Sequence, residues 1–130
     1  MKNKIPLLIY LFGGLLTVFG LFLAINNIFN ADKGLVDMSG NAPETILIRG
    51  MLISRNLAMA LTMAVALFSR SPKLTALAFF MRVVTDTADI VTFFSAGGFA
   101  NMGYIFLPVL LLEVVSLVVL LRISKSQETV

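Results

Sequence analysis

The chain contains four long apolar segments, which short polar or Gly/Pro-containing stretches separate. The segments cover roughly residues 5–28, 46–69, 72–95 and 104–123. Each has about the 20 residues that an α-helix needs to cross ~30 Å of hydrocarbon. The pattern predicts an all-α integral membrane protein, a single domain over residues 1–130 folded as a four-transmembrane-helix bundle. A loop at about 30–44 is expected between the first two helices.

Turn signals separate the predicted helices. Ser71 is expected to cap the third helix, with Pro72 at its first position. Asn41 and Glu44, with Pro43 between them, are typical of a capping box that opens the second helix. The second and third helices are therefore expected to form an antiparallel hairpin with almost no loop.

Composition supports the membrane assignment. The chain is 58% hydrophobic and only 13% charged, about half the charge of an ordinary soluble domain. It has no cysteine and no histidine, which excludes disulfides, thiolate chemistry, Cys/His zinc sites and a histidine base. A hard cation held by carboxylates stays chemically open, but no metal site and no cofactor are predicted.

Lysine and arginine are distributed unevenly between the two predicted ends of the bundle. One end carries Lys2, Lys4, Arg70, Lys73, Arg122 and Lys125, and the other carries Lys33. The positive-inside rule then places both termini and the turn near residue 70 in the cytoplasm, in a multi-pass protein of the cytoplasmic (inner) membrane. This topology accounts for the net charge of +3, so no nucleic-acid partner is expected.

Six charged residues lie inside the apolar segments: Arg49, Arg55, Arg82, Asp86, Asp89 and Glu113. Each unpaired charge at the centre of a membrane helix costs about 2.5–3.5 kcal/mol on insertion scales, so such residues are expected to pair, face water or bind something. Since three arginines balance three acids, the six are predicted to meet in one internal polar site.

Spacing gives this site a shape. Arg82, Asp86 and Asp89 follow an i, i+4, i+7 pattern and fall within about 60° of one another, so they predict one polar stripe on the third helix. Glu113, near the middle of the fourth helix, is the expected partner of Arg82 or Arg55. The predicted depths place the site in the outer half of the bilayer.

The leading hypothesis is a pocket that binds an amphiphilic or anionic small molecule or a lipid. Its arginines would hold a carboxylate or phosphate, and its acids would supply acid/base chemistry if the protein is an enzyme, a question that the sequence leaves open. The expected ligand-binding residues are Arg49, Arg55, Asn56 and Arg82. The expected catalytic residues are Asp86, Asp89 and Glu113.

Two other classes of function remain open. The acids could act as relay groups in an ion- or proton-coupled transporter or channel. Alternatively, the charges could form a structural ion-pair network in an accessory subunit of a membrane complex. Gly13 and Gly20, on one face of the first helix, favour close packing against a neighbouring helix in the bundle or, as the alternative, a homo-oligomer interface.

The residues Arg49-Gly50, Arg55-Asn56-Leu57-Ala58, Arg82, Asp86 and Asp89 resemble a pattern in small bacterial four-helix membrane proteins of the DoxX-like type and related families. The resemblance covers roughly residues 5–123 in architecture and only these positions in motif. It implies the four-helix membrane fold. Because these families mostly lack an assigned activity, it implies no reaction, and Asn56 stands where many members would have an acid.

Overall fold

The computed structural model describes residues 5–32, 39–95 and 103–128. It contains four α-helices: α1 (Leu7–Phe29), α2 (Pro43–Ser69), α3 (Pro72–Ser95) and α4 (Gly103–Glu128). The prediction of an all-helical chain with four helices is therefore confirmed. The largest differences from the predicted bounds are that α2 begins three residues earlier than expected and that α4 continues past residue 123 to Glu128.

Three of the helices are long and apolar enough to cross a membrane, namely α1, α2 and residues 106–126 of α4. Their outward faces carry large apolar side chains such as Leu8, Phe22 and Leu111, which are more than half exposed. Such continuous apolar surface suggests a membrane protein, because water does not tolerate it on a soluble monomer. The remaining helix, α3, has 24 residues and is also long enough, but it carries more charge.

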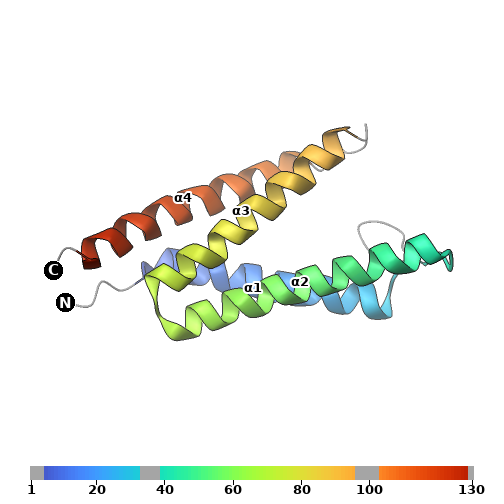
Figure 1. Cartoon of the computed structure of the whole chain (residues 1–130), viewed down its shortest axis with the longest axis horizontal. Coiled ribbons are helices and arrows are strands. Elements are labelled where there is room, and N and C mark those ends of the chain that lie inside the picture. The colour runs from blue at the N-terminus through green and yellow to red at the C-terminus, as the bar shows by residue number, and fades with distance from the viewer. Residues whose placement is uncertain (1–4, 33–38, 96–102, 129–130) are drawn as a thin grey trace.

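The helices form two antiparallel hairpins (Figure 1). α1 packs along α2 and α3 packs along α4, while α2 and α3 contact each other less extensively. We call the end of the molecule with the α2–α3 turn, the start of α1 and the end of α4 the turn end. The opposite end, at Phe29, Pro43, Ser95 and Gly103, is the loop end. The two hairpins meet at the turn end and diverge towards the loop end.

The apolar core lies near the turn end. Ile9 and Leu16 of α1 pack there with Met63 and Leu67 of α2. The other two helices contribute buried apolar residues, namely Ala76, Ala78 and Phe79 from α3 and Leu120 from α4. The rings of Phe12 and Phe79 stack with centroids 5.9 Å apart, which links the first hairpin to the second. All four helices are thus held together at this end.

The turn between α2 and α3 is as tight as predicted. Arg70 has a left-handed backbone with φ of 52°, and its N–H donates to the carbonyl of Leu67 over 3.0 Å. The Ser71 hydroxyl accepts from the N–H of Leu74 over 3.3 Å, which confirms it as the cap of α3. Pro72 opens the helix, as its missing N–H and fixed φ favour.

The predicted capping box of α2 is wrong. Ala42 is the N-cap residue, and no side chain caps this helix end. Pro43 occupies the first helical position, so the cap position falls directly before it and one residue after Asn41. The proline, whose φ already suits the first turn, determines where this helix begins.

Two glycines of α1 allow close contact with α2. A Cβ at Gly20 would lie 3.2 Å from Cβ of Ala60, and one at Gly13 would lie 3.2 Å from the side chain of Leu67. Gly14 has open space on the other side of the helix. The seven-residue glycine spacing therefore serves packing inside the bundle, which confirms the first of its two interpretations.

Candidate functional site

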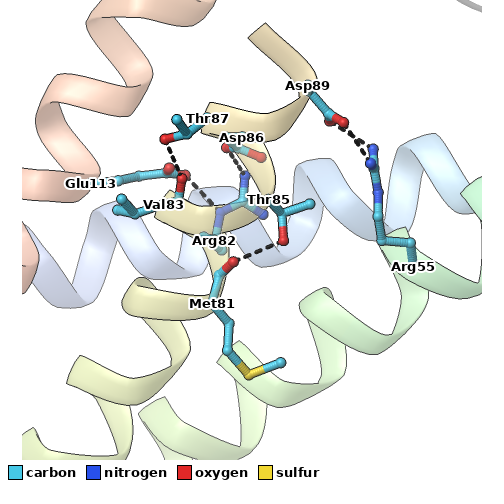
Figure 2. A network of polar contacts seen from close by, with 9 residues as sticks. All are labelled: Arg55, Met81, Arg82, Val83, Thr85, Asp86, Thr87, Asp89 and Glu113. Carbon is cyan, nitrogen blue, oxygen red and sulfur yellow. Dashed lines mark hydrogen bonds and ion pairs between the residues drawn. The ribbon is translucent and has the colours of Figure 1, made fainter. Parts of the chain in front are cut away.

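Five of the six predicted charges form two contact groups (Figure 2). Arg82, Asp86 and Glu113 make one group, which we call the triad. Arg55 and Asp89 make the other, which we call the clasp. The triad joins α3 to α4 within one hairpin, whereas the clasp joins α2 to α3 and therefore connects the two hairpins.

In the triad, one guanidinium serves two carboxyl groups. Nε of Arg82 donates to Oε1 of Glu113 over 2.7 Å, and Nη2 donates to Oδ2 of Asp86 over 3.2 Å. The Asp86 contact spans one helical turn, so it follows directly from the i, i+4 spacing. The contact with Glu113 confirms one of the two partners predicted for that acid.

Burial increases from Asp86 to Glu113. The side chains of Asp86, Arg82 and Glu113 are 20%, 12% and 0% exposed, respectively. Oε2 of Glu113 is buried and has no hydrogen-bond partner among the described residues. A buried carboxyl oxygen without a partner is costly, because it has lost its water and gained nothing in return.

The clasp is a bidentate ion pair. Nη1 and Nη2 of Arg55 donate to Oδ1 and Oδ2 of Asp89 over 2.7 and 2.8 Å. Both oxygens of Asp89 are therefore already engaged. The side chains are 36% and 32% exposed, so the pair lies nearer the surface of the bundle than Glu113 does.

Both groups lie on the loop-end side of the apolar core. Arg82 follows the fully buried Phe79 by three residues, about 15 Å along α3 from its start at the helical rise of ~1.5 Å per residue. Asp89 lies roughly 10 Å further along the same axis. The triad therefore sits near the middle of α3, and the clasp sits nearer the loop end, towards which the two hairpins diverge.

The single stripe predicted on α3 divides between two neighbours. Arg82 meets Glu113 of α4 and holds Asp86 on its own helix, whereas Asp89 meets α2. The reason is that α3 lies between α2 and α4, so residues at the two edges of a 60° stripe can reach different helices. The expected pairing of all six charges in one place is not what the described contacts show.

Two predicted ligand-binding residues take other positions. Within the described residues, Asn56 has no part in the triad or the clasp, and its backbone carbonyl lies 3.4 Å from the Cβ position of Gly20. It therefore belongs to the α1–α2 contact. Arg49 is half-buried in α2, six residues before Arg55 and thus about 9 Å closer to the loop end.

Two buried polar residues were missed by the sequence-based prediction, Thr75 and Ser116. Thr75 precedes Arg82 by seven residues, and its hydroxyl donates to the carbonyls of Ser71 and Ala66 over 2.9 and 3.3 Å. Ser116 follows Glu113 by three residues. Both spacings place the hydroxyl on the face of the nearby charge, a signal that could have found them.

The other hydroxyls of α3 are satisfied within the helix. Thr85, Thr87 and Thr92 donate to the carbonyls of Met81, Val83 and Ala88, each four residues earlier, over 2.6–2.8 Å. These hydroxyls therefore need no further hydrogen-bond partner in a lipid environment. The residues of α3 that need partners outside their own helix are thus mainly the charged ones.

The balance of charge in the two groups favours a positive ligand. The clasp is neutral, while the triad opposes two carboxyl groups with one guanidinium. Both arginines already donate to acids of this chain. Nε of Arg55 and Oε2 of Glu113 are buried without a hydrogen-bond partner among the described residues. An anion at Arg55 would add negative charge to the neutral clasp, whereas a cation or a proton at Glu113 would balance the extra acid of the triad.

Comparison of the chain with protein-family models, with curated proteins and with solved structures gives no match. The resemblance to DoxX-like proteins therefore stays a sequence-based hypothesis. The candidate function rests on the triad and the clasp.

Proposed function

We propose that this chain is a multi-pass membrane protein, with both termini cytoplasmic, whose triad binds the positively charged head of an amphiphilic small molecule. The observation that carries the proposal is the fully buried Glu113, whose Oε2 has no partner among the described residues. An ammonium group would supply the missing donor and the missing positive charge.

The sign of the ligand's charge follows from the balance of acids and arginines in the triad. The initial hypothesis of a carboxylate or phosphate ligand needs a guanidinium with free donors in the correct place. Arg82 instead donates through Nε and Nη2 to Glu113 and Asp86. Arg55 donates through both terminal nitrogens to Asp89, and its Nε has no partner among the described residues. The second carboxyl group of the triad, which no guanidinium balances, supports a cationic head over an anionic one.

The environment of the triad is the reason that we expect the ligand to have an apolar part as well as a charged head. The site lies in the middle of helices whose outward faces are apolar. A molecule that reaches it from the bilayer needs an apolar part that tolerates hydrocarbon and a polar head that pairs with the acids. Most ligand sites combine an apolar lining with a few polar groups in this way.

The three acids differ in the role that their contacts favour. Asp89 holds Arg55 with both oxygens and therefore suits a positioning role better than that of a general base. Asp86 and Glu113 are the acids that would contact a ligand. If the protein is an enzyme, these two would carry the acid/base step.

Ligands of matched tail length and opposite charge test the proposal. Protein in lipid nanodiscs is heated with decylammonium, decanoate or decanol below their micelle concentrations. We expect only decylammonium to raise the unfolding temperature. A ligand that binds the folded state adds about 2.7 kcal/mol to the free energy of unfolding when its concentration is 100 times Kd.

Two variants connect that effect to the triad. E113Q should lose the stabilisation by decylammonium, while E44Q, which changes an exposed acid in the first turn of α2, should keep it. If E113Q does not fold, D86N takes its place. Stabilisation by decanoate instead, or an equal response of E113Q and E44Q, would contradict the proposal and leave the triad as a structural ion-pair network.

A further inference from the structure

The triad has one negative charge too many for its surroundings. With both carboxyl groups ionised, Asp86 and Glu113 give two negative charges against the single positive charge of Arg82. An isolated net charge among apolar helices is strongly unfavourable, because neither hydrocarbon nor the helix backbone can solvate it.

Neighbouring elements do not remove this excess. α1 (Leu7–Phe29) contains no lysine, arginine or acid, and its titratable side chain is Tyr10. On α2, Arg55 is already engaged with Asp89, and Arg49 lies about 9 Å nearer the loop end. On α4, Arg122 follows Glu113 by nine residues, roughly 13 Å along the axis towards the turn end.

The geometry favours a proton as the missing positive charge in the resting site. Glu113 has no exposed surface, so a bulky cation reaches Oε2 only after the helices move. A proton needs no cavity. Bound to one of the two carboxyl groups, it makes the triad neutral and supplies a donor where a buried oxygen lacks a partner.

We propose that Asp86 and Glu113 together carry one proton in the resting site and that the cationic ligand binds in exchange for it. This inference rests on the proposed function. In the exchange, the O–H bond of the carboxylic acid breaks and the proton leaves to water. The ammonium group then donates an N–H to the carboxylate oxygen, so the charge of the site is unchanged.

Proton release on ligand binding tests this exchange directly. Decylammonium is titrated into wild-type nanodiscs at pH 7 by calorimetry, once in phosphate and once in Tris, whose heats of protonation differ. Alkylamines stay protonated at this pH, as lysine does with its pKa of about 10.4. We expect about one proton released per ligand bound.

A second readout is the pH dependence of the affinity. An exchange of one proton for one ligand makes the apparent Kd fall by up to tenfold for each unit of rising pH in the range where the site is protonated. D86N leaves one carboxyl group opposite Arg82, so this variant should lose both the binding of decylammonium and the proton release. E44Q should release the same amount as the wild-type protein.

The possible outcomes distinguish failure of the proton exchange from failure of the proposed function. Binding of decylammonium without proton release, and with an affinity that does not change between pH 6 and pH 8, overturns the exchange and leaves the proposed function standing. If decylammonium does not bind to the wild-type protein at all, the proposed function itself is overturned.

Discussion

Arg82 connects the two acids of the triad. Its guanidinium reaches an acid on its own helix and one on the neighbouring helix through two different nitrogen atoms. Loss of one partner from a buried ion pair typically costs about 3–5 kcal/mol, because the remaining charge stays buried without compensation. The position of Glu113 therefore depends on Arg82.

At the residue scale, Gly20 and Gly14 of α1 allow a prediction with its own control, because Gly20 contacts α2 and Gly14 does not. G20L should lower the unfolding temperature in detergent, because its side chain would meet Cβ of Ala60 and the carbonyl of Asn56, and overpacking costs about 1–3 kcal/mol. G14L should have little effect or raise the temperature, since nothing lies within 4 Å of that position. Equal losses in both variants would mean that α1 does not pack on α2 through Gly20.

Elements, rather than residues, determine which charges meet. α3 is the central helix of the charged region, with α4 on one side and α2 on the other. The contact of α2 with α3 is less extensive than the contacts within each hairpin. Beyond the apolar core, the clasp is thus the main described link between the hairpins.

At the element scale, charge reversal of the clasp should separate the hairpins. R55D and D89R each oppose like charges, so the distance between spin labels at L47C and F94C should increase. The double variant R55D/D89R restores opposite charges and should restore the wild-type distance. Electron paramagnetic resonance is practicable here because the natural chain has no cysteine.

Labels at F68C and L74C, close to the turn between the helices, provide the control for this experiment. Their distance should stay constant in all variants, because the apolar core holds this end. An unchanged distance between L47C and F94C in both single variants would show that the clasp does not hold the hairpins together.

For the molecule as a whole, the distribution of basic residues agrees with the two ends of the fold. Arg70, Lys73, Arg122 and Lys125 all lie at the turn end, and Asp32 and Glu44 lie at the loop end. Lys2, Lys4 and Lys33 lie outside the described residues. This asymmetry supports the proposed orientation, with the turn end in the cytoplasm.

At this scale, the orientation predicts a labelling pattern in intact cells that express the protein. A cysteine at N41C should react with a membrane-impermeant maleimide, whereas one at S126C should react only after the cells are permeabilised. The reverse pattern would contradict the proposed orientation. Reaction of both cysteines in intact cells would contradict the arrangement of the two ends on opposite sides of a membrane.

Much of the fold was predictable because membrane helices are encoded by local signals. Apolar length gave four helices, and Ser71 with Pro72 gave the tight turn. The Arg82–Asp86 contact follows from helical spacing alone. The partner of Asp89 was not predictable, because the side of α3 that faces α2 depends on how the two hairpins pack. Pairing with Arg55 is a property of that packing.

The two-residue connection between α2 and α3 has a consequence for biogenesis. Arg82, Asp86 and Asp89 of α3 would together cost about 8–10 kcal/mol at the centre of a bilayer on insertion scales. Because Arg70 and Ser71 are the whole linker, α2 and α3 stay adjacent at the turn, and Arg55 can pair with Asp89 as the two helices come together. Entry of the two helices into the lipid as one preassembled unit would neutralise part of that charge before α4 arrives with Glu113.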